Sequence, residues 1–490
     1  MGGDAEAVKV AVRLRPFNQR EKDRNAKLCI NMIGNKTTIA NPAEPDGKPK
    51  EFTFDFSYWS HDKSHEFHDQ VTVFNDLGIG VLDNAWNGFN TSLFAYGQTG
   101  AGKSYSMVGY GEDKGIIPLT CDELFKRIQR NEEAHTTFGV EVSMLEIYNE
   151  QINDLLNPKN RPKGGLKIRS NSALGVYVEG LSKHVVKNYQ EIEKEMEEGT
   201  LARTVASTNM NATSSRAHTV FTVYFTKTKN DPELAQPAAM QAKISLVDLA
   251  GSERAESTGA TGDRLKEGSA INQSLSALGN VISALAEKSK GKKDVFVPYR
   301  NSALTRLLQE SLGGNSKTIM IAALSPADIN YEETLSTLRY ADRAKQIKNK
   351  AVKNEDPQDK LIRELREQIA LLQAQLAGGA GAMAATEALR QKRGDDDVDN
   401  GTAAEQLEST MKLLEEAQMT DAEKDARTAQ YLKDREQDLE DNGLSILEIG
   451  GAYGIHKDQP HFVNLHEDPS LSENLIYFLK EGTTRIGKKG

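Results

Sequence analysis

Alternating and continuous runs of apolar residues divide most of the first 350 residues into strands and helices. Residues 8–12 alternate between apolar and polar positions, and residues 140–144, 220–225 and 243–247 are rich in β-branched and aromatic side chains. These patterns predict strands, whereas residues 266–286 repeat apolar positions at helical spacing. Strands that alternate with helices over this length predict an α/β fold, with a large, mostly mixed central sheet flanked by helices on both faces.

The pattern changes near residue 351 to long charged stretches with little apolar surface. Residues 351–440 are rich in Glu, Asp, Ala, Gln, Leu and Lys, which favours exposed helices over a packed core. The glycines within 378–381 and Gly394 predict breaks between helices. Aromatic and β-branched residues return after Gly443, so we expect a separate β-rich segment there.

Charge separates the same two parts of the chain. The 490 residues carry 61 Lys and Arg against 71 Asp and Glu, a net charge of −10, which argues against a general nucleic-acid binder. Residues 1–350 hold 44 basic and 43 acidic side chains, whereas residues 351–490 hold 17 and 28. A nearly neutral body therefore precedes an acidic extension.

Cysteine content and hydropathy indicate the compartment. Cys29 and Cys121 are the only two cysteines, which excludes a disulfide scaffold and fits a reducing environment. The sequence has no apolar run near the roughly 20 residues that span a bilayer, and the residues after Met1 do not form a signal peptide. We therefore expect a cytoplasmic protein without membrane contact.

A phosphate-binding loop is the most specific motif in the chain. Residues 97–104 read GQTGAGKS, match G-x-x-x-x-G-K-[ST] and follow an apolar strand pattern at 92–96. The glycines let backbone N–H groups surround phosphate oxygens, while Lys103 neutralises phosphate charge and Ser104 can ligate Mg²⁺. The motif predicts a nucleotide site, but it does not by itself separate a kinase from a GTPase or a motor.

Two further segments narrow this choice. Residues 211–218 read NATSSRAH and residues 248–253 read DLAGSE. Each alone also fits an ordinary polar loop or strand-end turn, but in this order after the phosphate loop they resemble switch I and switch II of the kinesin motor domain. Other segments that match this family are RLRP at 13–16, GIIP at 115–118, VPYRNSALTRLL at 297–308 and LRYA at 338–341. The resemblance covers about Val8 to Pro357.

This resemblance implies an ATPase stimulated by microtubules, with ATP and Mg²⁺ bound by a defined set of residues. The adenine pocket would be lined by Arg13, Pro16 and Tyr105, and the phosphates would lie in the loop Gly97, Gln98, Thr99, Gly100, Ala101, Gly102, Lys103 and Ser104. The metal would be surrounded by Ser104, Ser215 and Asp248. Ser214 and Gly251 would face the γ-phosphate, and an Arg216–Glu253 ion pair would close around the attacking water, with Glu253 relaying its proton.

One position departs from the family pattern within switch I. Ala217 stands where the family usually has Ser, so a hydroxyl is missing beside the switch I arginine. The sequence therefore leaves two functions open. One is an ATP-driven motor that moves towards the microtubule plus end, and the other is a nucleotide-gated microtubule crosslinker with weak turnover.

Lysines after the long helix indicate the contact with the microtubule. Lys288, Lys290, Lys292 and Lys293 lie where kinesin-3 motors carry a lysine-rich loop, although such a run taken alone also fits a solvated loop. Binding to an acidic track through this loop should weaken with salt. Other cations at positions that match track-facing residues of the family are Arg254, Arg264, Lys266, Arg300 and Arg306.

The resemblance also implies a division into six segments. They are a motor domain at 1–345, a neck linker at 346–357, a neck coil at 358–377, a flexible hinge at 378–402, a first coiled coil at 403–442, and a linker with the start of a forkhead-associated domain at 443–490. In the neck linker, Ile347 would fill a core pocket and Asn354 would bind the backbone. Lys353 replaces a residue that is commonly Val, which would weaken docking.

The neck coil has a short apolar seam. Ile362, Leu365, Ile369, Leu372 and Leu376 recur at spacings of 3 and 4, which fits either a conditional homodimer or a single helix packed on the motor. We expect one further helix over about 403–441, whose poor seam favours a solvated or folded-back helix. The hypothesis that follows is that the neck coil and this helix pair within one chain and inhibit the monomer.

Overall fold

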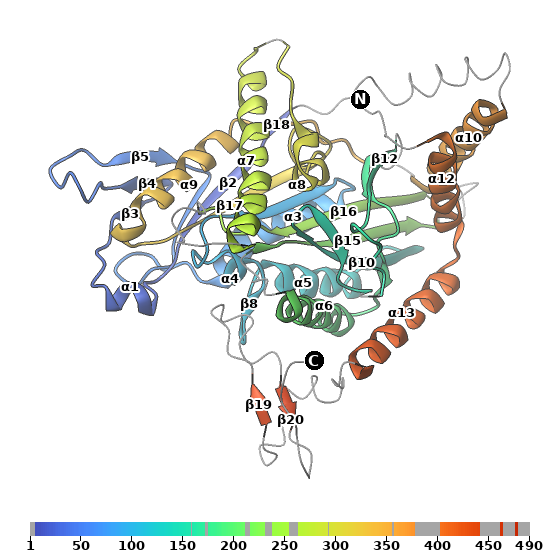
Figure 1. Ribbon diagram of the computed structural model, residues 1–490, viewed down its shortest axis with the longest axis horizontal. Helices are drawn as coiled ribbons and strands as arrows, with labels where there is room; N and C mark the ends of the chain where they lie inside the picture. Colours follow the sequence, from blue (N-terminus) through green and yellow to red (C-terminus); the bar gives the residue numbers. More distant parts are fainter. Residues whose placement is uncertain are drawn as a thin grey trace.

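The computed structural model describes residues 5–157, 159–171, 175–210, 216–230, 238–253, 263–292, 294–354, 357–377, 402–441, 461–463 and 476–478. At its centre is a sheet in the order β11–β10–β15–β16–β7–β17–β2–β6, with β14 also paired to β10 (Figure 1). The antiparallel side consists of β11 (Gln151–Asp154), β10 (Thr136–Tyr148), β14 (His184–Val185), β15 (His218–Lys229) and β16 (Ala238–Asp248).

The other side of the sheet is parallel. From β16 it continues through β7 (Thr91–Tyr96), β17 (Lys317–Leu324), β2 (Lys9–Leu14) and β6 (Phe56–Trp59). Because these strands run in one direction, their carboxyl ends meet at a single edge, which is where ligands bind in open α/β sheets. Every residue of β7 is buried, as expected for a central strand covered on both faces.

Helices cover both faces of the sheet, and each face has its own core. One face carries α7 (Asp263–Ser289), α8 (Ala303–Leu307) and α9 (Tyr331–Ala344), and the other carries α3 (Ile79–Trp86), α5 (Ile116–Gln129) and α6 (Tyr189–Met210). Leu278 and Leu338 are fully buried in the first core, and Leu82 and Ile192 are buried in the second. This arrangement confirms the α/β fold predicted from the sequence.

The predicted elements lie within longer ones. The strand patterns at 8–12, 140–144, 220–225 and 243–247 fall in or beside β2, β10, β15 and β16, and the helical pattern at 266–286 falls in α7. Smaller elements of the body are β1 (Glu6–Ala7), α1 (Gln19–Asp23), β3 (Ile30–Ile33), β4 (Lys36–Ile39), β5 (Lys50–Thr53), α2 (Gln70–Val73), η1 (Phe74–Gly78), α4 (Lys103–Met107), β8 (Gly109–Tyr110), β9 (Asp113–Lys114), β12 (Ile168–Asn171), β13 (Gly175–Val178), η4 (Tyr299–Asn301), η5 (Asp328–Asn330) and β18 (Lys348–Asn349).

The C-terminal helices fold back onto the body. α10 (Pro357–Ala377) packs against α12 (Ala403–Gln418), and α13 (Asp421–Asp441) packs against β14 (Figure 1). The expectation of one helix over 403–441 is wrong, because the chain breaks at Met419 and Thr420. The reason is a capping box: the Thr420 hydroxyl accepts from the Glu423 N–H (3.3 Å), and the Glu423 carboxylate accepts from the Thr420 N–H (2.7 Å).

The last described elements are two short strands. β19 (His461–Val463) and β20 (Ile476–Phe478) pair antiparallel in the segment for which the sequence predicts a β-rich structure. Within the described part of the chain, none of the helices combines the length and the apolar character needed to cross a bilayer.

Candidate active site

The phosphate-binding loop connects β7 to α4 at the carboxyl edge of the sheet. Gly97, Gly100 and Gly102 all have positive φ, and a Cβ on Gly97 would lie 2.5 Å from the Ala323 carbonyl oxygen. Only glycine fits this close approach to β17. Lys103 is buried, and its ammonium group donates to the Gly97 and Gln98 carbonyls at 2.9 and 3.0 Å. Carbonyl groups of the loop therefore hold the Lys103 ammonium group within the loop itself.

A hydroxyl and a carboxylate meet directly beside this loop. The Ser104 Oγ donates to Asp248 Oδ2 at 2.6 Å, which joins the start of α4 to the end of β16. Hydroxyl and carboxylate oxygens suit Mg²⁺, which usually binds one or two protein ligands together with substrate phosphates. The described residues include no cluster of three or more His, Cys, Asp or Glu side chains that would hold a metal alone. The donor set therefore fits a magnesium ion shared with a nucleotide.

The three residues expected to line the adenine pocket differ in exposure, because Arg13 is buried, Tyr105 is half-buried and Pro16 is exposed. Arg13 is only 4% exposed and donates to Ser60, Gln70 and Ser106, while its guanidinium lies 5.2 Å from the centre of the Tyr105 ring. Burial lowers the pKa of Arg13, whereas burial and the nearby Asp113 carboxylate raise the pKa of Tyr105. The Arg13 guanidinium thus packs on the Tyr105 ring, and Tyr105 is the side chain that can stack on a nucleotide base.

Switch II contacts the phosphate-binding loop through Glu253. Its carboxylate accepts from the Thr99 N–H at 2.7 Å and from the Thr99 hydroxyl at 2.5 Å. A Cβ on Gly251 would collide with the Thr99 hydroxyl and the Glu253 carboxylate, so a larger residue here would have to displace the side chains that form this contact. Both carboxylate oxygens are occupied by Thr99, and no salt bridge joins Glu253 to Arg216, two residues that the structure describes. Ser214 and Ser215 lie outside the described residues.

His218, which the sequence motif contained without a role, connects the two switches. It is buried, its Nδ1 accepts from the Ala250 N–H at 3.0 Å, and its Nε2 donates to Ser274 Oγ of α7 at 2.9 Å. Burial, with a smaller effect of Lys103, lowers the pKa of His218 to about 3. A neutral imidazole therefore joins the end of switch I to switch II and to the long helix.

The segment predicted to be a neck linker lies along the sheet. Ile347 is fully buried in the core of the α7 and α9 face. Asn354 donates from its backbone to the Gly88 carbonyl (2.8 Å) and from its side chain to Asn90 Oδ1 (2.8 Å) and the Gln241 carbonyl (2.9 Å). β18 pairs antiparallel with β1, and Lys353 forms an isolated bridge with Phe89.

The predicted track cations whose side chains the structure describes lie near the end of α7, in η4 and on α8. Lys288, Lys290, Lys292 and Arg300 are exposed, and Arg306 is half-buried. Lys292 also pairs with Glu287 at 2.7 Å. Arg254 and Lys293 lie outside the described residues, and only the backbone is described for Arg264 and Lys266 in α7. Figure 1 shows this end of α7 projecting away from α12 and α13.

The chain matches two family models. The kinesin motor domain model matches residues 13–347, and a model described as kinesin-associated matches residues 397–483. The chain therefore belongs to the kinesin family, and its fold is that of a P-loop kinesin motor domain followed by helical segments.

Similar proteins agree with this assignment. The chain is 56% identical to Kinesin-related protein 1 of Dictyostelium discoideum over 98% of its length, and 48% identical to Kinesin-like protein KIF1A of Rattus norvegicus over 99%. These relatives confirm the kinesin-3 assignment made from the sequence. The chain spans only 22% and 31% of their respective lengths.

Solved structures give the same fold. One is a KIF14 dimer in its two-heads-bound state with AMP-PNP, in complex with a microtubule. It is 48% identical, has a TM-score of 0.67, and the match covers 74% of this chain and all of that one. Another is a fast kinesin, 41% identical with a TM-score of 0.64, for which the match covers 71% of this chain and 94% of that one.

Proposed function

We propose that this chain is an ATP-driven, plus-end-directed microtubule motor for intracellular transport, held in an inhibited monomer by its own C-terminal helices. One observation carries the motor assignment. Asn354 binds at Gly88 and Asn90, and β7 runs directly from Asn90 to the phosphate-binding loop. A single buried strand thus joins the nucleotide site to the segment that would move, and a crosslinker with weak turnover does not need such a moving segment.

The nucleotide is bound by backbone N–H groups of residues 97–104 and by Lys103, with Pro16 and Tyr105 at the base. Ser104 and Asp248 would hold Mg²⁺, which would neutralise phosphate charge when bound. Thr99 and Gly251 bring Glu253 to the phosphate side of the loop. After switch I closes, Glu253 exchanges Thr99 for Arg216 and orients the attacking water. Ser214 and Ser215, which lie outside the described residues, would complete the γ-phosphate and metal surroundings.

Track binding uses the cations near the end of α7, in η4 and on α8. Lys288, Lys290 and Arg300 extend into solvent on a part of the body that α12 and α13 do not cover. Exposed lysines opposite an acidic surface raise the association rate more than they strengthen the final contact. This arrangement supports a cytoskeletal location, with landing on microtubules that depends on salt.

Inhibition rests first on the seam of the neck coil. Leu365 and Leu372, two of the five seam residues, are fully buried in the chain as folded, and α10 packs on α12. The Gln368 side chain accepts from Asn171 of β12 at 2.8 Å in a buried contact. A second neck coil can reach this seam only after α12 separates from α10. Dimerisation through the neck coil therefore requires release of α12 from α10.

Inhibition rests secondly on α13. Arg435 is 2% exposed and donates to Glu195 of α6 at 2.8 Å, with Glu198 in contact on its other side. Closer to β14, the Val185 N–H donates to Thr428 Oγ1 at 3.0 Å, and Tyr431 stacks on His184. Since α6 leads directly into switch I, a docked α13 restrains the helix that switch I must move.

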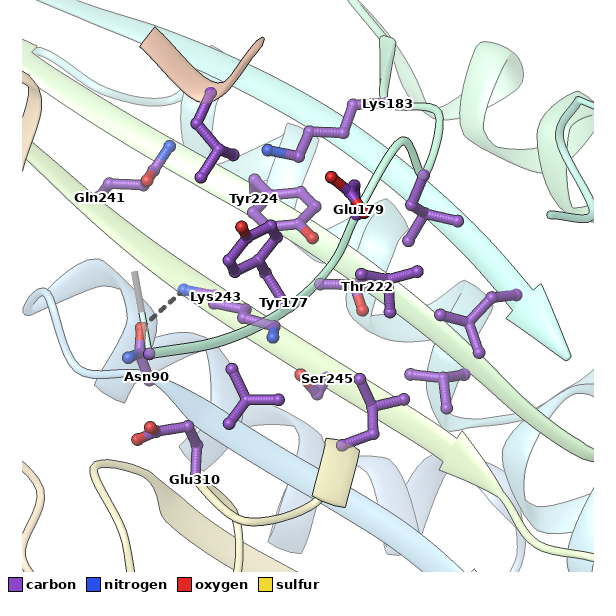
Figure 2. A pocket seen from close by; sticks show the side chains of 18 of the residues that line it. Asn90, Tyr177, Glu179, Lys183, Thr222, Tyr224, Gln241, Lys243, Ser245 and Glu310 are labelled. Carbon is purple, nitrogen blue, oxygen red and sulfur yellow. Dashed lines mark hydrogen bonds between the residues drawn. The ribbon is translucent and has the colours of Figure 1, made fainter. Parts of the chain in front are cut away.

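A third feature that supports inhibition is the cavity between α12 and the sheet, which the neck linker also lines. A cavity of about 1110 Å³ separates α12 from β15 and β16. Figure 2 shows its lining by Tyr177, Tyr224, Gln241 and Glu310. The neck linker residues Val352–Asn354 form part of the same wall, together with Glu416 of α12 and Met419, which directly follows α12. Tyr177 reaches α12 through a 3.1 Å hydrogen bond with Ser409. The neck linker therefore lines the same cavity as α12, with Asn354 half-buried and Val352 and Lys353 exposed.

Microtubule-stimulated ATPase activity and single-molecule motility test this function together. A motor hydrolyses ATP faster on adding microtubules and moves in one direction towards the plus end. Binding that depends on nucleotide but shows neither stimulated turnover nor movement would support the crosslinker, in which Ala217 would account for slow hydrolysis. Absence of nucleotide binding would contradict both functions.

A further inference from the structure

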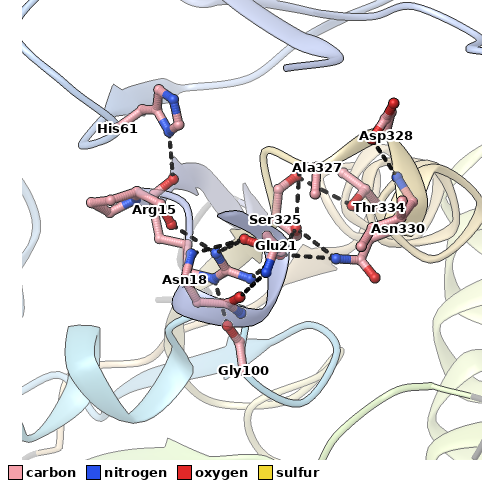
Figure 3. Close-up of polar contacts among 12 residues, drawn as sticks. Arg15, Asn18, Glu21, His61, Gly100, Ser325, Ala327, Asp328, Asn330 and Thr334 are labelled. Carbon is pink, nitrogen blue, oxygen red and sulfur yellow. Dashed lines mark hydrogen bonds and ion pairs between the residues drawn. The ribbon is translucent and has the colours of Figure 1, made fainter. Parts of the chain in front are cut away.

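A buried carboxylate behind the adenine side of the phosphate-binding loop has no role in the account above. Glu21, in α1, has a side chain only 1% exposed, yet it lies among polar partners (Figure 3). Its oxygens receive two hydrogen bonds from the Arg15 guanidinium, Nη1 to Oε2 at 2.7 Å and Nη2 to Oε1 at 2.6 Å. This paired geometry fixes the plane of the arginine, which a single contact would leave free to rotate.

Arg15 uses its remaining donors on the nucleotide site itself. Its Nε donates to the Gly100 carbonyl in the middle of the phosphate-binding loop at 2.5 Å, and its Nη1 also donates to the Pro16 carbonyl at 2.7 Å. Gly100 belongs to the loop that would hold the phosphates, and Pro16 to the wall that would hold the base. Arg15 thus ties the two sides of the nucleotide site together.

Glu21 is held in turn by three other groups. The Asn18 N–H donates to Oε2 at 3.0 Å as half of a capping box, whose other half is the Glu21 N–H donating to Asn18 Oδ1. Ser325 Oγ and Asn330 Nδ2 donate to Oε1 at 2.8 and 2.9 Å. Burial raises the pKa of Glu21. Hydrogen bonds from Arg15, the Asn18 N–H and Ser325 lower this pKa by more than burial raises it, so the carboxyl group is held ionised.

Ser325 and Asn330 extend this network to the helix that precedes the neck linker. Ser325 follows β17, and its carbonyl accepts from Thr334 Oγ1 of α9 at 3.4 Å. Asn330 immediately precedes α9, and α9 ends at Ala344, three residues before the buried Ile347. The same carboxylate therefore contacts both the arginine that spans the nucleotide site and the start of the α9 helix.

We propose that Glu21 is a positioning residue, which aims Arg15 at the phosphate-binding loop and thereby sets how tightly the motor holds nucleotide. This inference rests on the nucleotide binding proposed above. Glu21 does not touch the reacting groups, so its loss should weaken nucleotide binding while the chemical step keeps its rate. Its contacts with Ser325 and Asn330 make the hold on nucleotide depend on the position of α9.

Glu21→Gln in the full chain tests the proposal. The amide nitrogen of Gln would face donors from Arg15, Ser325 or Asn330, so the paired contact with Arg15 is lost. We expect KM for ATP to rise about tenfold and release of a fluorescent ADP to accelerate by a similar factor, the size typical of one charge-assisted hydrogen bond, with kcat changed less than about twofold. Arg15→Lys keeps the charge without the fork and should reproduce this pattern.

Two controls separate the possible outcomes. Glu51→Gln changes an exposed carboxylate, paired with Lys36 on the β4–β5 hairpin, and should leave KM and ADP release unchanged.

A lower melting temperature in Glu21→Gln and Arg15→Lys with unchanged KM and ADP release would overturn the proposal, since Glu21 would then be only structural. If the unaltered chain bound no nucleotide, the proposed function itself would fail. If Glu21→Gln did not fold, Arg15→Lys alone would decide, because it leaves the carboxylate and its other partners in place.

Discussion

The motor body and the C-terminal helices are held by different forces. In the body, both faces of the sheet are packed by fully buried apolar side chains, such as Phe94 in β7 and Leu338 in α9. In contrast, α13 is attached through Arg435, Thr428 and two surface ion pairs, Lys187–Asp425 and Lys424–Glu141. Apolar burial supplies the main driving force for folding of the body, whereas polar contacts of this kind can be exchanged for water or for another partner.

This difference matches a division between chemistry and control. The nucleotide site is assembled from the ends of β2, β7, β16 and β17, which are parts of one rigid sheet. The helices that would restrain the motor lie near the end of the chain. Among the described contacts they contribute no residue to the nucleotide site. Changes in one region should therefore leave the fold of the other region intact, and the following variants test this separation.

The largest effect should come from the body. Glu253→Ala removes the acid that reaches the phosphate-binding loop while leaving residues 97–104 and Lys103 in place. We expect nucleotide to bind within a few fold of normal and microtubule-stimulated turnover to fall by about a hundredfold or more, as for other positioned charged groups in phosphoryl transfer. Fluorescent-nucleotide binding and steady-state ATPase assays measure the two quantities, and near-normal turnover would contradict the assignment of Glu253.

The next effect should come from the extension. Arg435→Glu places a third carboxylate against Glu195 and Glu198, and breaking such a buried pair typically costs about 3–5 kcal/mol. We expect α13 to undock and microtubule-stimulated turnover per chain to rise about tenfold. Lys433→Glu makes the same charge change at an exposed position of the same helix and should have little effect. Equal activity of the two variants would show that this contact does not restrain the motor.

A smaller effect should follow from the lysines in the last turn of α7 and just after it. Replacing Lys288, Lys290, Lys292 and Lys293 by Ala should lower the landing rate on microtubules several-fold at low salt, with kcat at saturating microtubules nearly unchanged. The reason is that exposed charges act mainly on association. Landing counted by fluorescence microscopy over a range of salt concentrations measures this, and a landing rate equal to that of the unaltered chain at low salt would refute the role of the loop.

The smallest effect concerns pH and the interior of the body. His218 has a pKa of about 3 in the folded chain against an ordinary value of 6.5, so between these values the unfolded state binds one more proton. The stability that depends on neutral His218 is complete above about pH 6.5 and declines as the pH falls, by up to about 1.4 kcal/mol per pH unit. His218→Asn should lose this part of the pH dependence of the melting temperature between pH 7.5 and 5.5. An unchanged slope would contradict a neutral, buried His218.

Local patterns in the sequence predict the parts of the structure that depend on neighbours in the chain. The apolar runs give the central strands, the GQTGAGKS motif gives the phosphate-binding loop, and Asn354 lies in the segment that the linker pattern indicates. The break in the second helix was missed, although the Thr420–Glu423 capping box carries the signal. A similar Asn-x-x-Glu pattern marks Asn18 and Glu21 at the start of α1.

Contacts made across the fold could not be predicted in the same way. Arg435 looks like any other charge on a polar helix, and only the folded chain brings it between Glu195 and Glu198, 240 and 237 residues earlier in the sequence. The sequence suggested that Glu253 pairs with Arg216, whereas in the structure it contacts Thr99, because two loops from different strands meet at the carboxyl edge of the sheet. The roles of these residues remain predictions that the variants above can test.

The central claim is that the acidic extension restrains a complete motor. Its most direct test is single-molecule motility on microtubules for the full chain and for a chain that ends at residue 378, each at matched concentration and with its mass measured in solution. We predict that removing residues 379–490 increases directed movement and ATP turnover and allows dimers to form through Leu365 and Leu372. A shortened chain that is no more active and no more dimeric than the full chain would contradict the account.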